Sequence, residues 1–131
     1  LAAKNLAEGK NYIEEFSKAN EVILHESGVA YKVISKGTGE KPLLNDTVTC
    51  HYHGTNIKGE VFDSSVERGN PATFQINKLI KGWQNIMPVL EIGTKAILVI
   101  PADLAYGEEQ ISKEIGPNST LIFEIELLEK K

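Results

Sequence analysis

The spacing of the apolar residues changes near residue 28, and this change divides the chain into two parts. Residues 1–26 contain no proline and are rich in Ala, Leu, Glu and Lys, which favour helix. Positions 2, 6, 9, 13, 16, 20 and 23 form one series with alternating spacings of four and three, in which Gly9 and Asn20 are weak members. This pattern predicts one long helix with a narrow apolar face, stopped by Ser27-Gly28.

From residue 28 onward, short runs either alternate between apolar and polar residues or are continuously apolar, as strands do. Six runs fit this description: 29–34, 48–53, 61–62, 74–76, 96–100 and 121–128. One short helical segment, roughly 81–87, lies between the fourth and fifth runs, and Pro88 would end or kink it. The order of these elements predicts an α+β fold, in which an antiparallel sheet of five to six strands packs on one short helix.

A chain of 131 residues corresponds to about one domain. The two patterns predict a helical connector over residues 1–26 and a folded domain over residues 27–131. Residues 1–26 are either a helix packed on its own domain or the end of a longer helix that joins the domain to an N-terminal module before Leu1. The narrow apolar stripe and the start at Leu rather than Met favour the second interpretation.

The composition excludes several classes of protein. A net charge of −4, from 14 basic and 18 acidic residues, disfavours a general nucleic-acid binder. The longest uninterrupted apolar run, residues 96–101, is far shorter than the roughly 20 residues that span a bilayer. The single cysteine, Cys50, excludes an intrachain disulfide and a cysteine-based zinc cluster.

The usual catalytic motifs are absent: the sequence has no Gly-rich phosphate loop, no CxxC pair and no HExxH. Cys50 lies on the apolar side of a strand pattern and is interpreted as a small buried hydrophobe. His51 and His53 share one face of that strand, roughly 6.6 Å apart. They are either two solvent-facing histidines, which we favour, or part of a metal site that needs a third ligand.

Most of the aromatic residues stand apart on strand and loop positions: Tyr52, Phe62, Phe74, Trp83, Tyr106 and Phe123. They either fill a small core or line an open pocket. The residue pattern alone leaves both alternatives open.

Five fragments, in order along the chain, resemble the FKBP-type peptidyl-prolyl cis-trans isomerases. They are His-Tyr-His-Gly at 51–54, Val-Phe-Asp-Ser-Ser at 61–65, Leu-Ile-Lys-Gly-Trp at 79–83, Ala-Tyr-Gly at 105–107 and Gly-Pro-Asn-Ser-Thr-Leu-Ile-Phe-Glu-Ile-Glu-Leu-Leu at 116–128. The resemblance runs from about residue 28 to residue 129. The preceding helix, with Glu-Ser-Gly-Val-Ala-Tyr-Lys-Val at 26–33, is similar to the macrophage infectivity potentiator and FkpA subgroup. In that subgroup a long helix leads to a dimerisation module.

The resemblance implies a twisted antiparallel sheet curled around the helix near Lys81, with a substrate pocket between them. Trp83 would form the floor of this pocket. The walls would be Tyr52, Phe62, Phe74 and Phe123, and the rim would be Leu79 and Ile80.

The resemblance also implies polar contacts with a bound peptide, whose carbonyls would accept hydrogen bonds from the Ile80 backbone N–H and the Tyr106 hydroxyl. Asp63 would lie at the pocket edge, held by Tyr52 or Arg68. Ile115 would lie in a loop that overhangs the site. Together with Asp63 and Tyr106, the residues expected to act in catalysis are Tyr52 and Phe62.

The activity implied by the resemblance is peptidyl-prolyl cis-trans isomerisation that assists protein folding, with no cofactor and no metal. The expected partners are proline-containing peptides, unfolded or partly folded proteins, and macrolides such as FK506 or rapamycin. Nucleic acid and a membrane span are not expected. A homodimer would form through a module before Leu1, and the location would be the bacterial periplasm or cell envelope, with the cytoplasm as the alternative.

Three positions depart from the family pattern, and they motivate a second hypothesis. Ala72 stands where the family often has an aromatic residue, Ile111 where it often has a polar one, and Gly116 where many members have Pro. The alternative function is a non-catalytic chaperone or docking module that binds proline-containing chains.

Overall fold

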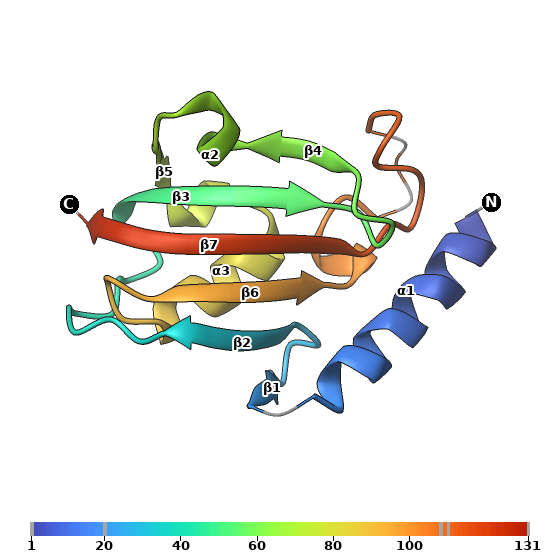
Figure 1. The fold of residues 1–131 in the computed structure, drawn as a ribbon, viewed down its shortest axis with the longest axis horizontal. Helices are drawn as coiled ribbons and strands as arrows, with labels where there is room; N and C mark the ends of the chain where they lie inside the picture. The colour runs from blue at the N-terminus through green and yellow to red at the C-terminus, as the bar shows by residue number, and fades with distance from the viewer. Residues whose placement is uncertain (1, 20, 108, 110, 131) are drawn as a thin grey trace.

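This computed structural model describes residues 2–19, 21–107, 109 and 111–130. Its main element is one antiparallel sheet (Figure 1). Within those residues the sheet has seven strands: β1 (Val22–Leu24), β2 (Ala30–Ser35), β3 (Thr47–Thr55), β4 (Val61–Ser64), β5 (Ala72–Gln75), β6 (Lys95–Ile100) and β7 (Leu121–Lys130). Their order is β1-β2-β6-β7-β3-β4. β5 also pairs with β3, so that β4 and β5 share one edge of it.

The long strands β3 and β7 have one apolar face because their sequences alternate with a period of two. In β3 the buried residues are Val48, Cys50, Tyr52 and Gly54, and in β7 they are Leu121, Phe123, Ile125 and Leu127. These two strands lie side by side at the centre of the sheet and place both sets on the same face. The alternation predicted from the sequence is confirmed.

The main core lies between this face and helix α3 (Lys81–Ile86), which Figure 1 shows behind the sheet. α3 ends at Ile86, and Pro88 lies in the short 3₁₀ helix that follows it, Met87–Val89. Two further 3₁₀ helices, Ile76–Lys78 and Ala102–Leu104, and the one-turn helix α2 (Ser65–Arg68) lie in the connections. The expected α+β fold, with a curled antiparallel sheet around one short helix, is confirmed.

The N-terminal helix is shorter than predicted, since α1 (Ala2–Ser17) ends well before residue 26. Residues 22–24 instead form β1, which pairs with β2 from Val22 opposite Lys32 to Leu24 opposite Ala30. The prediction of helix is therefore wrong for residues 18, 19 and 21–26, whereas residues 1 and 20 of the predicted helix lie outside the described residues. The β-branched Val22 and Ile23 favour a strand once an edge is available to pair with, and β1 raises the six predicted strands to seven. The division of the chain into residues 1–26 and 27–131 stays a prediction.

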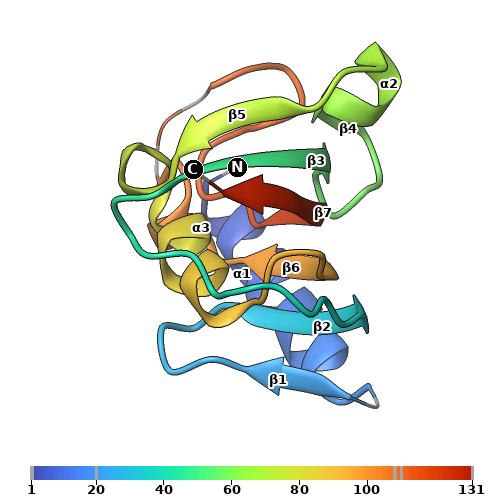
Figure 2. The same cartoon turned by 90° about the vertical axis from the view of Figure 1, so that its left-hand side faces the viewer.

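The two views show where the ends of the sheet lie relative to the helices. In Figure 1, α1 runs along the end of the sheet at which β6 leaves and β7 begins, and Figure 2 shows α1 behind the sheet. The part of the β6–β7 connection that leads into β7 therefore lies against α1, which also packs on β1 and β2. This placement brings the N-terminal helix close to a loop that also reaches the candidate site.

Helix α3 approaches β6 through a glycine, which gives a first testable prediction. A Cβ at Gly82 would lie 2.5 Å from Cγ2 and 2.8 Å from Cδ1 of the fully buried Ile100. We expect Gly82→Ala to lower the free energy of unfolding by about 1–3 kcal/mol through overpacking, although Ala favours helix over Gly by about 1 kcal/mol. Urea unfolding measures this, with the exposed Lys81→Ala as the control. A Gly82→Ala variant as stable as that control would contradict the close packing.

Candidate active site

An apolar pocket of about 140 Å³ opens between the sheet, α3 and the connection after β6. Its lining residues come from six parts of the chain, and every one of them was singled out from the sequence: Tyr52, Phe62, Asp63, Phe74, Leu79, Ile80, Trp83, Tyr106 and Phe123. The structure thus brings together nine of the eleven predicted site residues. Their roles toward a substrate stay predictions.

Trp83 lines this pocket and contacts three of the aromatic side chains around it. The indole is only 4% exposed. Its ring centroid lies 4.9 Å from that of Phe123, 5.6 Å from that of Tyr52 and 5.8 Å from that of Phe74, each with the rings steeply inclined. Such edge-to-face contacts stabilise a fixed arrangement of rings. The aromatic residues therefore serve both alternatives left open by the sequence: they pack as core and leave a cavity above Trp83.

Gly54 is a site residue that the sequence reasoning did not select. A Cβ at this position would lie 2.7 Å from Phe62 Cζ and 2.8 Å from Phe123 Cε1, which is closer than packed carbon atoms can approach. The two rings meet at 90° with centroids 5.5 Å apart, directly over the Gly54 backbone. A glycine inside an alternating strand pattern is the signal that could have found it, because such glycines often mark a close approach.

Asp63, Tyr52 and Arg68 form a connected polar group at the pocket edge. The Tyr52 hydroxyl donates to Asp63 Oδ2 at 2.7 Å, and Arg68 Nη2 donates to the Tyr52 hydroxyl oxygen at 2.9 Å. Arg68 Nη1 also forms an ion pair with Asp63 Oδ1. The Arg68 guanidinium lies over the Tyr52 ring, 5.6 Å from its centroid. The sequence left open whether Tyr52 or Arg68 holds Asp63, and both contact it.

The charges in this group perturb its acid–base behaviour. Burial raises the pKa of Asp63, but hydrogen bonds from Tyr52 and Arg68 and the positive charge of Arg68 outweigh it, so the net pKa is lowered. Burial and the hydrogen bond to Asp63 raise the pKa of Tyr52. Asp63 is therefore ionised and Tyr52 neutral at neutral pH, which suits an orienting role better than proton transfer.

The lowered pKa of Asp63 predicts how stability depends on pH. Because the folded pKa lies below the unfolded value of about 3.9, the stabilising contribution is complete above that value and is lost as the pH falls through the folded pKa. We expect the stability difference between the wild type and Asp63→Asn to shrink between pH 6 and pH 2. Urea unfolding across this range measures it, with the exposed Asp103→Asn as the control. A difference that stays constant with pH would contradict the ionised state.

The rim of the pocket offers a free backbone donor. Ile80 is the N-terminal capping residue of α3, and its N–H makes no hydrogen bond within the described part of the chain. The neighbouring Leu79 carbonyl already accepts a 2.6 Å hydrogen bond from Gln84 Nε2. Tyr106 stands at the mouth and is 37% exposed. A ligand in the pocket would thus find Ile80 N–H on one side and the Tyr106 side chain on another.

Two predicted site residues lie outside the lining of the pocket. Arg68 contacts it only through Asp63 and Tyr52. Ile115 is 3% exposed and belongs to the core cluster, although its loop folds on itself through hydrogen bonds from the N–H groups of Ile111 and Ser112 to its carbonyl.

The three family departures also lie away from this lining. Ala72 pairs with Cys50 in the sheet and packs against the core, while Ile111 is exposed. Gly116 lines a different cavity, beside α1. None of the three departures is therefore a lining residue of the pocket above Trp83, and their effect on ligand binding stays a prediction.

The remaining candidate residues lie on other surfaces. His51 and His53 face a cavity of about 540 Å³ on the outer face of the sheet, and the Nδ1 atom of each is hydrogen-bonded to the hydroxyl of Ser65 or Ser64, respectively. Within the described ranges, no group of three His, Cys, Asp or Glu side chains is arranged to hold a metal ion. Cys50 is fully buried, and burial raises the pKa of its thiol to about 12, so it is no nucleophile.

Comparison with known proteins places these features in one family. The family model described as FKBP-type peptidyl-prolyl cis-trans isomerase matches residues 38–128. The chain is 48% identical over 123 residues to the FKBP-type 22 kDa peptidyl-prolyl cis-trans isomerase of Escherichia coli, covering 94% of this chain and 60% of that protein. It is 42% identical over 130 residues to the outer membrane protein MIP of Legionella longbeachae, covering 99% and 56%. The chain thus spans little more than half the length of these relatives.

A solved structure agrees with the same assignment. The crystal structure of FkpA from Escherichia coli matches with a TM-score of 0.94 at 44% identity, covering 99% of this chain and 61% of the other. None of the helices among the described residues has the length and apolar character needed to cross a membrane.

Proposed function

The chain belongs to the FKBP-type peptidyl-prolyl cis-trans isomerases, and on that premise we propose that it accelerates rotation about X–Pro bonds in protein substrates. The observation that carries the proposal is the aromatic pocket above Trp83, with Asp63, Tyr52 and Arg68 joined at its edge. The proposal extends to protein folding, because X–Pro rotation is slow enough to limit folding.

The reaction needs no nucleophile, because no bond is broken. Amide resonance opposes rotation with a barrier of about 18–20 kcal/mol. The twisted amide of the transition state has lost much of its charge separation, so an apolar cavity disfavours the planar ground state more than the twisted state. A site that binds the twisted state more tightly accelerates the reaction by that difference. A 10⁵-fold acceleration corresponds to about 7 kcal/mol.

The pocket residues would contribute to this acceleration in three ways: through the shape of the cavity, through orientation of other side chains and through hydrogen bonds to the peptide. The prolyl ring would enter the cavity above Trp83, bounded by the Phe62 and Phe123 rings. The free Ile80 N–H and the Tyr106 hydroxyl would hold carbonyls of the peptide on either side of the rotating bond. Asp63 would keep Tyr52 and Arg68 in place and present a negative charge at the pocket edge. Held on both sides, the peptide can rotate at the prolyl bond with little loss of other contacts.

Exchange spectroscopy by NMR on a peptide containing one X–Pro bond tests the proposal directly. We expect catalytic amounts of the chain to accelerate cis-trans exchange well above the uncatalysed rate. A folded chain that leaves the exchange rate unchanged would exclude the activity. Binding of FK506 or rapamycin, which we propose from family membership, can be followed through the fluorescence of Trp83, the single tryptophan.

Aggregation suppression separates the alternative function, chain binding without turnover, from isomerisation. The exposed Tyr106 at the pocket mouth favours some capacity to hold unfolded chains. If Asp63→Ala abolishes isomerisation but leaves suppression of aggregation and the cellular role intact, catalysis is not the main task. If all three fall together, catalysis is the task.

Location and assembly of the whole protein are further proposals. We propose the bacterial cell envelope, with support from the name of the Legionella relative, an outer membrane protein. Cell fractionation with an antibody against this chain tests it, and a cytoplasmic signal would exclude it. A homodimer through a module before Leu1 rests on the family subgroup, and sedimentation of the full-length protein tests that.

A further inference from the structure

Helix α1 contacts the loop that leads into β7 through two positions on one helix face, Asn5 and Gly9. Gly9 is buried against Thr120: a Cβ at Gly9 would lie 2.1 Å from Thr120 Oγ1 and 3.0 Å from Thr120 Cβ. Four residues earlier, Asn5 Nδ2 donates to the Pro117 carbonyl at 2.8 Å. Residues four apart lie above one another on a helix. The same face of α1 therefore holds both ends of the segment 117–120.

That segment is bonded in turn to the neighbour of Tyr106. The Asn118 N–H donates to the Gly107 carbonyl at 2.7 Å, and the Gly107 N–H donates to the Ala102 carbonyl at 2.8 Å. Asn118 has a φ of +58°, in the left-handed region that asparagine tolerates better than most residues. Such a conformation persists only where surrounding contacts hold it. A continuous chain of contacts thus runs from α1 through Asn118 and Gly107 to Tyr106, at the pocket mouth.

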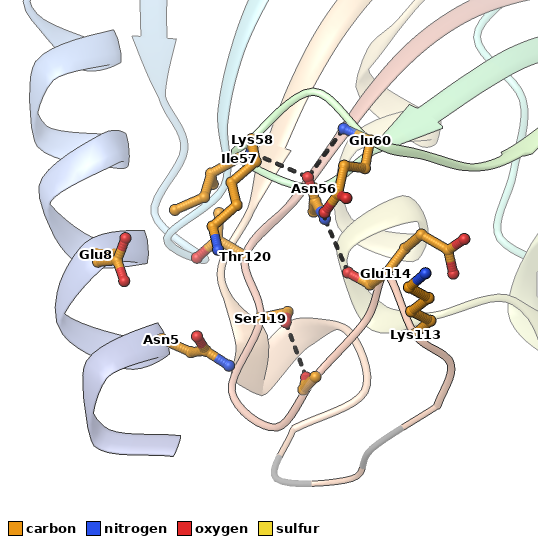
Figure 3. A pocket seen from close by; sticks show the side chains of 11 residues that line it. Asn5, Glu8, Asn56, Ile57, Lys58, Glu60, Lys113, Glu114, Ser119 and Thr120 are labelled. Atoms are coloured by element: carbon orange, nitrogen blue, oxygen red, sulfur yellow. Dashed lines mark hydrogen bonds between the residues drawn. The ribbon is translucent and has the colours of Figure 1, made fainter. Parts of the chain in front are cut away.

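The loop has space to move if the contacts with α1 are lost. A cavity of about 160 Å³ lies beside them, lined by Asn5 and Glu8 of α1, by residues 56–58 and 60, and by residues 113, 114, 116, 119 and 120 (Figure 3). Across this cavity Asn56 Nδ2 donates to the Glu114 carbonyl at 3.0 Å and anchors the other part of the loop. Because side chains leave this space open, the α1 contacts are not backed by dense packing.

We propose that Asn5 and Gly9 are positioning residues for the isomerase reaction, which they serve by holding residues 117–120, and through Asn118 also Gly107, so that Tyr106 reaches the pocket. The inference rests on the proposed function and adds to it a part of the chain outside residues 38–128, the range that matches the family model. In this arrangement α1 belongs to the working unit of the site, although none of its residues lines the pocket.

Two substitutions in the full chain test this inference, each with a matched control on an exposed position of α1. Gly9→Val pushes the helix away from Thr120, and Ala7→Val also introduces a β-branched valine into α1, at a position where the side chain is exposed. Asn5→Asp replaces the donor to Pro117 with an acceptor, and Asn11→Asp adds the same charge on an exposed site. We expect kcat/KM of both test variants to fall about 3- to 10-fold. Both controls should match the wild type.

A purely structural role of α1 would lower stability without altering the site, so the measurements are made where urea titration shows each variant folded. The NMR signal of the Gly107 amide should shift in Gly9→Val and Asn5→Asp and stay in place in the controls. In a Tyr106→Ala background, the loss caused by Gly9→Val should shrink to less than about twofold, because residues acting through one another are not additive.

The outcomes distinguish a failure of the proposed function from a failure of this inference alone. A wild type that does not accelerate exchange removes the proposed function and this inference with it. An active wild type whose Gly9→Val and Asn5→Asp variants keep full kcat/KM overturns the inference alone, and assigns the loop position to Asn56. An undiminished Gly9→Val effect in the Tyr106→Ala background also overturns it, because α1 would then act by another path. If Gly9→Val does not fold, Asn5→Asp carries the same test through a side chain that is already partly exposed.

Discussion

Gly54→Val is expected to abolish most of the isomerase activity, lowering kcat/KM by about 100-fold or more. The added Cβ would fall 2.7 Å from Phe62 and 2.8 Å from Phe123, so both rings must leave their places. Both rings line the cavity of about 140 Å³, and we expect the displaced rings to enter it. The same overpacking should lower the free energy of unfolding by about 1–3 kcal/mol. NMR exchange on an X–Pro peptide and urea unfolding measure the two effects.

Thr55→Val is the matched control for this prediction. It places the same side chain on the next residue of β3, where it faces away from the buried surface. We expect it to keep the activity of the wild type. Gly54→Ala provides a smaller displacement in case Gly54→Val does not fold, and should fall between the two. A Gly54→Ala or Gly54→Val variant with unchanged kcat/KM would show that the two rings need not stay where they are.

Asp63→Ala is expected to lower kcat/KM about tenfold to 100-fold, less than the roughly 100- to 1000-fold loss from removing one oxyanion-hole donor, because Asp63 orients neighbouring groups rather than stabilising an oxyanion. The Tyr52 hydroxyl would lose its acceptor, and Arg68 would be left as an unpaired positive charge at the pocket edge. Stability should change less than activity, because the Asp63 side chain is 45% exposed and exposed ion pairs contribute little. The same exchange assay measures the effect.

The double variant Asp63→Ala/Arg68→Ala tests whether the unpaired charge of Arg68 causes the loss of activity. If the uncompensated charge of Arg68 causes much of the loss, the double variant should be more active than Asp63→Ala alone, since coupled residues give non-additive effects. Asp103→Ala, an exposed acidic residue on the chain after β6, controls for the change in net charge. Equal activity of Asp63→Ala and the wild type would show that Asp63 does not contribute to the reaction.

The parts of the fold that could be predicted are those with a local period. Val48, Cys50 and Tyr52 alternate with polar neighbours, and this alone sets which side of β3 is buried. Pro88 marks the end of α3 because proline cannot continue a helix. The boundary at Ser17 could not be predicted. Residues 22–24 form a strand because they pair with β2, and that pairing depends on a strand edge that the local sequence does not contain.

In the site, too, part could be predicted from the sequence and part depends on the tertiary structure. The five fragments that resemble the family contain eight of the nine lining residues, all except Phe74. The pattern itself left open whether the aromatic residues fill a core or line a pocket. That choice depends on the angles between rings around Trp83, which only packing determines.

By itself the sequence determined the class of fold, the inward face of each long strand and the family, because these follow from residue types and short spacings. Only the tertiary structure decided that a helix ends at Ser17, that Ile115 is a core residue, and that Arg68 and Tyr52 together hold Asp63. The tertiary structure also decided which side chains pack against two glycines. Gly54 and Gly9 look alike in the sequence, but the space at a glycine depends on which distant atoms approach it. Here those atoms belong to Phe62 and Phe123 at one, and to Thr120 at the other.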